Sequence, residues 1–271
     1  MPAPTIDQAF VTEYEQGVHL AYQRMGSQLR PFFRYRAGVK NKTYFQKMGK
    51  GTATQKARHG DIPPMNLDHS NVNVTLEDWY AGEWIDDLDL LRVNHEEMVV
   101  AQDSGAYALG RKTDELIVTA LTTTTTSANE TSNGLTKAWA MGVIETLGNA
   151  DAPMNDRYGT LAWENWTQAL SLDEFVRADY VGVGSEMLPN GMAAKKWLNI
   201  TWFPFSGLTD DGSNRMCFVW QRMAAALAVG ADVQSNMQYY NVKDSTFVQN
   251  KMQMNAVLID VNGVIKCNLK K

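Results

Sequence analysis

The chain has 271 residues, with 25 Lys and Arg, 30 Asp and Glu, two Cys and 44% hydrophobic residues. This composition predicts one large or two small folded domains and excludes a wholly disordered chain. No apolar run reaches the roughly 18 residues of a transmembrane helix, and the first residues lack the pattern of a secretory signal. Two cysteines cannot form a disulfide framework, so we expect a reducing compartment.

The net charge of −5 is the sum of two blocks of opposite sign. Residues 24–58 contain ten basic residues and no acidic one, whereas residues 77–97 contain eight acidic residues and a single Arg. Such segregation indicates either a polyanionic partner or association between copies of the chain.

The first half of the chain begins with a segment of helical periodicity, which is followed by a segment with few apolar residues. Residues 6–29 are predicted to form a helix that either packs on its own core or docks on a neighbouring molecule. Residues 32–70 suit an extended hairpin with Gly49-Lys50-Gly51 near its tip, with a long flexible loop as the alternative. A strand over 72–76 and a long helix over 95–121, about 40 Å in length, follow.

The second half mixes shorter helices and strands. The dipeptide Asn262-Gly263, between apolar segments 257–261 and 264–269, predicts a two-residue β-hairpin. The other predicted elements are a helix over 135–147 capped by Ser132 or Asn133, a helix after the capping box Ser171-Leu172-Asp173-Glu174, and strands over 197–205 and 216–220.

No combination of residues predicts catalysis or metal binding. His95-Glu96-Glu97 lacks the second His of a zinc helix, and neither Cys has a neighbouring base. Arg58-His59-Gly60-Asp61 is superficially like the loop of histidine phosphatases, but it lies in a Gly- and Pro-rich segment. We therefore expect no catalytic residue, no metal and no cofactor.

A nucleic-acid-binding module over residues 24–58 is an alternative function. This stretch combines basic residues with five aromatic ones, a pattern typical of single-strand binding. The remainder of the chain is acidic on balance, which opposes this alternative.

Several segments, in this order and spacing, resemble the major capsid proteins of tailed bacteriophages, which have the Hong Kong 97-type fold. The resemblance covers nearly the whole chain. The segments are Gly26-Ser27-x-Leu29-Arg30, Thr54 through Arg58-His59-Gly60-Asp61-Ile62-Pro63, Asp68-His69, Val72-x-Val74-x-Leu76-x-Asp78, Ile85-Asp86-x-Leu88-Asp89 and Tyr107-Ala108-Leu109-Gly110-Arg111-x-x-Asp114.

The resemblance implies an α+β fold with four parts. They are an N-terminal arm over 1–31, an extended E-loop over 32–75, a peripheral domain with a long spine helix over 76–125 and 231–271, and an axial domain over 126–230.

The resemblance also implies a structural protein rather than an enzyme. Such a chain assembles in the bacterial host cytoplasm into hexamers and pentamers of the icosahedral virion shell. Its partners are other copies of itself, portal and scaffolding proteins, decoration proteins in some relatives, and packaged double-stranded DNA through non-specific contact, with no membrane. Only about 30 residues precede the loop, so we expect a separate scaffolding protein, and we expect no covalent crosslinks between subunits.

In this fold the E-loop lies across the peripheral domain of the neighbouring subunit, which suggests a role for the charge blocks. We expect the basic residues of the loop to lie over acidic residues of the next subunit; alternatively, they face packaged DNA on the inner shell surface. The basic set is Arg34, Arg36, Lys40, Lys42, Lys47, Lys50, Lys56 and Arg58, and the acidic set is Glu83, Asp86, Asp87, Asp89, Glu96 and Glu97.

Overall fold

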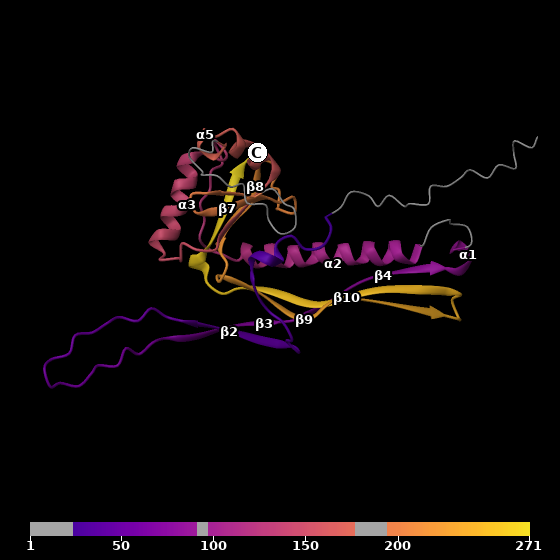
Figure 1. Ribbon diagram of the computed structural model, residues 1–271, viewed down its shortest axis with the longest axis horizontal. Helices are drawn as coiled ribbons and strands as arrows, with labels where there is room; N and C mark the ends of the chain where they lie inside the picture. The colour runs from indigo at the N-terminus through magenta and orange to yellow at the C-terminus, as the bar shows by residue number, and fades with distance from the viewer. Residues whose placement is uncertain (1–23, 91–96, 177–193) are drawn as a thin grey trace, which may run out of the picture.

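The computed structural model describes residues 24–90, 97–176 and 194–271. It combines two β-sheets, a long helix and a thin β-ribbon that projects from one side of the body (Figure 1). This arrangement confirms the predicted α+β fold.

The helices are α1 (Asp87–Leu90), α2 (Glu97–Thr122), α3 (Lys137–Asn149), α4 (Trp163–Leu170) and α5 (Asp173–Val176), with 3-10 turns at Arg30–Phe32 and Val261–Gly263. The strands are β1 (Arg34–Arg36), β2 (Lys42–Met48), β3 (His69–Thr75), β4 (Glu77–Asp86), β5 (Arg157–Leu161), β6 (Lys195–Trp197), β7 (Ile200–Pro204), β8 (Asn214–Gln221), β9 (Ala225–Tyr240), β10 (Ser245–Leu258) and β11 (Val264–Lys270).

The long helix α2 packs on one face of a four-stranded sheet of order β1-β9-β10-β4, which we call the peripheral sheet. Val248, Met252 and Met254 lie at alternate positions of β10 and are buried. The Thr113 hydroxyl of α2 contacts the sulfur atoms of both methionines. Because strand side chains alternate between faces, the other face of the sheet points away from α2. Near the start of β9 the ribbon covers that face, where Phe45 and Val74 pack with Ala226 and Ala228. The predicted spine helix over 95–121 is confirmed from Glu97, where the described residues resume, and it ends at Thr122, one residue beyond the predicted end.

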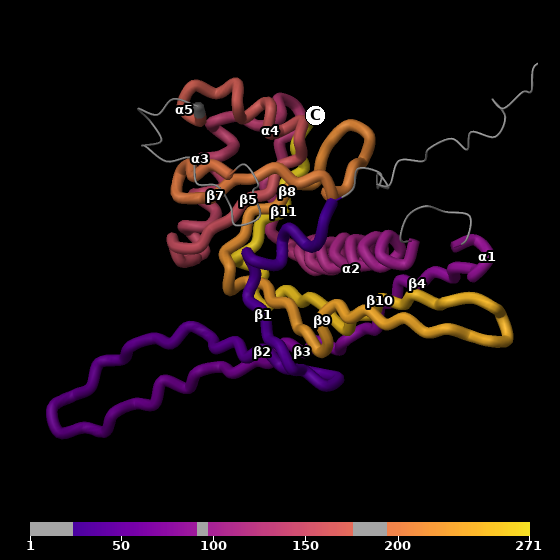
Figure 2. The backbone as a smooth tube through the Cα atoms, turned by 45° about the vertical axis from the view of Figure 1, so that its right-hand side comes forward, coloured from indigo at the N-terminus to yellow at the C-terminus, as the bar shows by residue number. Residues whose placement is uncertain are grey.

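The second sheet has five strands in the order β11-β8-β5-β7-β6 and is flanked by α3, α4 and α5 (Figure 2). We call it the axial sheet. Large aromatic side chains fill its core, among them Trp202, Phe203, Phe218 and Trp220, all at most 1% exposed. Large aromatic side chains bury more apolar surface each than aliphatic ones, so they contribute strongly to the stability of this core.

Strands β2 and β3 form an isolated antiparallel ribbon of seven residue pairs. The backbone N–H of Gly49 donates to the Asp68 carbonyl at 2.8 Å, and no ladder continues beyond that bond. The extended hairpin is therefore confirmed, but the predicted tip is wrong. Gly49-Lys50-Gly51 lies where the ladder ends, and the chain turns further out, where the Gly60 N–H donates to the Ala57 carbonyl at 3.0 Å.

The predicted helix over 6–29 is wrong over residues 24–29, which are irregular, and its remainder lies outside the described residues. Gly26 has a φ of +68°, which a continuous right-handed helix does not allow. The N-cap of α3 is Thr136 rather than Ser132 or Asn133, and its hydroxyl accepts from the Trp139 N–H at 3.2 Å.

The hairpin predicted at Asn262-Gly263 is also wrong. This dipeptide lies in a 3-10 turn that joins β10 of the peripheral sheet to β11 of the axial sheet. The hairpin in this region is instead β9–β10, which no turn signal in the sequence predicts. A turn signal reports local backbone preference, whereas burial against a core decides which strands pair.

These pairings differ from the predicted domain boundaries at two places. Strand β9 begins at Ala225, so the boundary between 230 and 231 falls inside one continuous strand. The predicted boundaries place β11 in the peripheral domain, but it pairs with β8 in the axial sheet. Its alternate residues, such as Ile265 and Cys267, are fully buried there, which explains the change of sheet.

Candidate assembly interface

The predicted basic set begins on β1 and continues along the ribbon. The Arg34 guanidinium lies 5.5 Å from the centre of the Phe45 ring, and Arg36 donates to the Tyr44 carbonyl at 3.4 Å. The Lys42 ammonium lies 5.4 Å from the centre of the Tyr44 ring. Both arginines and Lys42 are exposed, so these contacts leave the charges accessible.

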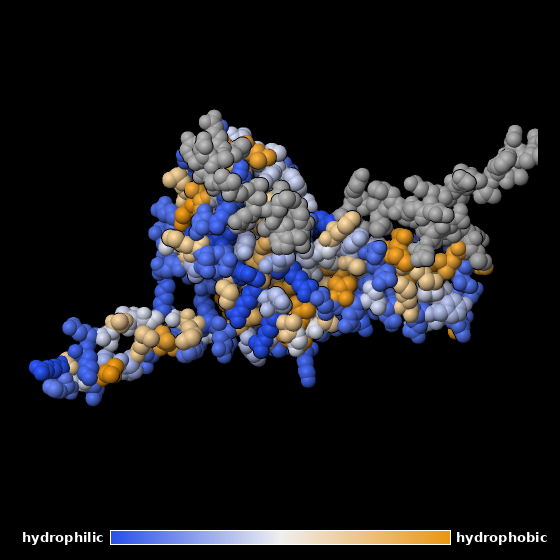
Figure 3. Space-filling view, in the orientation of Figure 1, coloured by the Kyte–Doolittle hydropathy of each residue, from blue (hydrophilic) through white to orange (hydrophobic). Residues whose placement is uncertain are grey.

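Two lysines of this set contact acidic residues of their own subunit. Lys47 pairs with Asp260 at 2.9 Å, and Lys50 pairs with Asp151 at 2.5 Å. Lys50 lowers the pKa of the Asp151 carboxyl by donating a hydrogen bond to it. The projecting loop carries mostly hydrophilic side chains with a few apolar ones between them (Figure 3). The remaining members of the set, all exposed, are Lys40, Lys56 and Arg58.

The predicted acidic set gathers at the opposite end of the peripheral sheet, where β4 meets α1 (Figure 1). The Asp86 carboxylate accepts from the Leu88 N–H at 3.1 Å and so holds the turn into α1. The described members are Glu83 and Asp86 on β4, Asp87 and Asp89 on α1, and Glu97 at the start of α2. Glu96 lies outside the described residues.

The two charged sets are not brought together within one subunit. The two ion pairs that the basic set makes within the described residues, Lys47–Asp260 and Lys50–Asp151, both use carboxylates outside the acidic set. The ribbon and its loop point away from the body on one side, and α1 lies at the other extreme (Figure 1). Contact between the sets therefore requires a second copy of the chain.

Aromatic side chains on the solvent face of the peripheral sheet lie beside the acidic set. The Trp84 ring lies 4.6 Å from the Phe247 ring and 5.2 Å from the Tyr240 ring, measured between centroids. The Lys243 ammonium lies 3.8 Å from the centre of the Trp84 ring. Trp84 remains 43% exposed, so this surface offers apolar area next to carboxylates.

Residues 24–33, which we call the strap, cross from α2 to both sheets (Figure 2). The Asp114 carboxylate of α2, 1% exposed, accepts from the Ser27 hydroxyl at 2.6 Å and from the N–H groups of Gln28 and Leu29 at 3.1 and 3.0 Å. Burial raises the pKa of Asp114, and these hydrogen bonds oppose the rise. The strap backbone approaches α2 so closely that a Cβ on Gly110 would lie 2.5 Å from backbone atoms of Gly26.

The other end of the strap reaches both sheets. Arg30 forms two hydrogen bonds with Asp232 of β9, at 2.9 and 2.8 Å, and this pairing lowers the pKa of the Asp232 carboxyl. Phe33 stacks on Trp220 of the axial sheet with ring centroids 4.8 Å apart. The strap thus fixes α2, β9 and the axial sheet relative to one another. The sequence alone indicates no such role, although the segments around Gly26 and Asp114 that form this contact both carry the resemblance to phage capsid proteins.

This burial weakens the nucleic-acid alternative. Phe32, Phe33 and Phe45 are at most 5% exposed and cannot stack on bases. Of the five aromatic residues in the basic stretch, only Tyr35 and Tyr44 are exposed.

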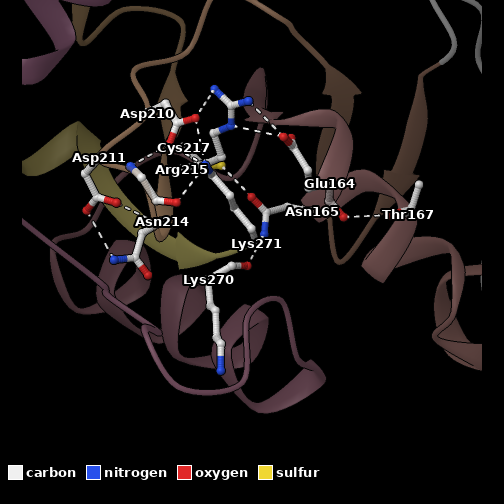
Figure 4. A network of polar contacts seen from close by, with 11 residues as sticks. Glu164, Asn165, Thr167, Asp210, Asp211, Asn214, Arg215, Cys217, Lys270 and Lys271 are labelled. Carbon is white, nitrogen blue, oxygen red and sulfur yellow. Dashed lines mark hydrogen bonds and ion pairs between the residues drawn. The ribbon is translucent and has the colours of Figure 1, made fainter.

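A polar network ties β11 to α4 and β8 (Figure 4). Arg215 donates to the Glu164 carboxylate at 2.8 Å, which lowers the pKa of Glu164, and pairs with Asp210 at 3.3 Å. The Asn165 amide donates to the Lys270 carbonyl at 2.7 Å. These pairs satisfy one another's charges, which is typical of a structural network rather than a reactive site.

The two thiols are fully buried beneath this network and have no disulfide partner. Burial raises the pKa of Cys217 to about 12, so the thiolate needed for nucleophilic attack is absent at neutral pH. Within the described ranges, no group of His, Cys, Asp and Glu could hold a metal ion, and no helix combines the length and apolarity of a membrane span.

Comparison with known proteins gives a consistent result. The family model described as phage capsid protein matches residues 6–270. The capsid of the cyanophage P-SCSP1u aligns with a TM-score of 0.72 at 12% identity, covering 97% of this chain and 94% of that chain. The capsid of Ralstonia phage GP4 aligns with a TM-score of 0.73 at 9% identity, covering 96% and 95%. A structure from Mycobacterium phage Che8 aligns with a TM-score of 0.69 at 15% identity, covering 95% and 97%. A search of curated proteins gave no match.

The family model covers nearly the whole chain, and the overall fold is shared with solved phage capsids, in agreement with the expected Hong Kong 97-type fold. The chain belongs to the phage capsid protein family, and it is a major capsid protein that forms the phage head.

Proposed function

We propose that subunits of this capsid protein assemble head to tail, with the E-loop of one subunit resting on the acidic end of the peripheral sheet of the next. The observation that carries this proposal is that one subunit bears complementary charged sets at its opposite extremes. A contact between two different surfaces of the same chain closes into a ring when the rotation allows, as in pentamers and hexamers.

Repetition makes weak charge pairs effective in such a ring. An exposed ion pair contributes only about 0–1 kcal/mol. Each subunit of a closed ring makes the contact twice, once with its loop and once with its acidic end, so the contributions accumulate over the shell. Complementary charges also select the register and accelerate encounter between subunits.

The proposal extends to location and partners. The chain is assembled in the bacterial host cytoplasm and resides in the virion, with portal and scaffolding proteins as assembly partners and decoration proteins as further candidates. Packaged double-stranded DNA makes non-specific contact with the shell. The proposed role is structural and assigns no catalytic step to any residue.

A charge-exchange experiment tests the contact. Lys56 and Arg58 suit it because both are exposed in the distal loop, beyond the ribbon. We expect the double variant Lys56→Glu/Arg58→Glu to remain a soluble subunit that forms neither capsomers nor shells by size-exclusion chromatography and negative-stain microscopy. Adding Glu83→Lys/Asp86→Lys to the same chain should restore assembly.

The control variant Lys56→Arg/Arg58→Lys keeps both charges and should assemble as the natural sequence does. The broader variant Lys42→Glu/Lys47→Glu/Lys50→Glu should also fail to form shells. Normal assembly of the reversed variants would show that the charge contact is wrong. A salt-sensitive gel shift by a monomer would favour the nucleic-acid alternative instead.

A further inference from the structure

Strand β4 has a long free edge. It pairs with β10 through all ten of its residues and is the last strand of the peripheral sheet. Within the described part of the chain, no strand pairs with its other side. A free edge presents a row of unpaired N–H and C=O groups that can accept a further strand.

The composition of this edge restricts what can pair with it. Four of the ten residues of β4 are exposed carboxylates: Glu77, Asp78, Glu83 and Asp86. Like charges that face each other across two strands are destabilising, whereas opposite charges are favourable. The edge therefore disfavours pairing with another β4 and favours a basic strand.

The E-loop contains two extended arms without ladder partners, and only one of them suits this edge. Residues 61–68 contain two prolines and two aspartates, so this arm has lost two of its N–H donors and its carboxylates repel the acidic edge. Residues 50–56 contain no proline and no acidic residue, begin and end in lysine, and are exposed throughout.

The spacing of the charges is the same on both segments. Lys50 and Lys56 are six residues apart, as are Glu77 and Glu83, so each pair occupies one face of its strand. When the two lysines lie opposite the two glutamates, Ala53 lies opposite Tyr80, whether the strands run parallel or antiparallel. A small side chain thus meets a tyrosine that is 63% exposed.

We propose that residues 50–56 of one subunit add as a further strand to the β4 edge of a neighbouring copy, with Lys50 and Lys56 opposite Glu77 and Glu83. This inference rests on the proposed head-to-tail assembly and specifies how the loop is held. Lys50 exchanges its exposed partner Asp151, in its own subunit, for a glutamate of the neighbour. Backbone hydrogen bonds then supply directional contacts that charge alone does not.

A proline scan over residues 52–55 tests the backbone pairing. In an added strand, alternate N–H groups point toward β4 and the others point away. We expect one alternate pair, either Thr52→Pro and Thr54→Pro or Ala53→Pro and Gln55→Pro, to raise the concentration needed for assembly about ten-fold or more, while the other pair changes it about two-fold or less. These four residues lie outside helices and strands in the subunit, so the thermal unfolding midpoint should not move.

Disulfide trapping tests the register. Cβ atoms of directly opposed residues lie about 4.5–5.5 Å apart, close enough for cysteines to be bridged after a small adjustment. We expect Ala53→Cys/Tyr80→Cys shells to give a reducible ladder of linked subunits under mild oxidation. The matched control Ala53→Cys/Ala81→Cys should give little, because Ala81 faces α2 on the other side of the sheet. The natural cysteines are buried.

The results of the proline scan and the disulfide trapping distinguish strand addition from the head-to-tail assembly on which it rests. Shells that form equally well with all four prolines, or that crosslink equally at Tyr80 and Ala81, would overturn strand addition and leave the charge contact standing. Absence of capsomers and shells from the natural sequence itself would overturn both.

Discussion

The Ser27 hydroxyl donates a 2.6 Å hydrogen bond to the buried carboxylate of Asp114, although 87 residues separate them in the chain. This bond and the two N–H groups beside it hold the strap against α2. The strap in turn contacts both sheets, so Asp114 stabilises the relative position of the two halves of the subunit.

Replacement of Asp114 by Ala should destabilise the subunit by about 2–4 kcal/mol, because it leaves buried strap donors without an acceptor. Chemical denaturation of the subunit measures this change. Asp103→Ala, at an exposed position on the same helix, should change stability by about 0.5 kcal/mol or less. Equal effects of the two variants would contradict the role assigned to the strap.

Gly110→Ala should also destabilise the subunit, by about 1–3 kcal/mol, because the added methyl group would overlap the backbone of Gly26. The control is Gly142→Ala in α3, where a Cβ meets nothing within 4 Å. There the loss of glycine flexibility should stabilise the helix by about 0.5–1 kcal/mol. The thermal unfolding midpoints of the two variants should therefore move in opposite directions. A shift in the same direction would contradict the close approach of Gly110 to Gly26.

The pairing of Arg30 with Asp232 should make stability depend on pH at the acidic end. Because this pairing lowers the pKa of Asp232 in the folded state, its stabilisation is present above the unfolded value of about 3.9 and is lost as the pH falls through the folded value. Asp232→Asn should remove this part of the pH dependence. Urea midpoints measured between about pH 6 and pH 3 test this, with Asp61→Asn in the distal loop as the control.

Both cysteines should resist alkylation by iodoacetamide in the native subunit at neutral pH and react fully after denaturation. Burial excludes the reagent and raises the pKa of both thiols, so the reactive thiolate does not form. Mass spectrometry of the treated protein measures the modification. Rapid labelling of the folded subunit would show that the axial sheet opens.

Local pattern alone determined several parts of this protein. The spine helix follows from apolar residues at helical spacing, and the projecting ribbon follows from a segment too poor in apolar residues to form a core. The charge blocks were visible from positions such as Lys56 and Glu83 without any structure, although their pairing between subunits stays a prediction. These features depend on residues that are close together in the sequence, where periodicity and composition are direct physical constraints.

The tertiary structure alone decided which strands pair, which distant segments come into contact and which sheet edge stays unpaired. Asn262-Gly263 has the local signature of a hairpin, but the apolar side chains of β11 are buried by the axial sheet, and that burial outweighs the turn preference. The hydrogen bond between Ser27 and Asp114 joins segments that are far apart in the chain. The spacing of apolar residues along the sequence does not predict a contact of this kind. The free edge of β4 likewise became visible only once the order of the strands was known, because an unpaired edge is a property of the whole sheet.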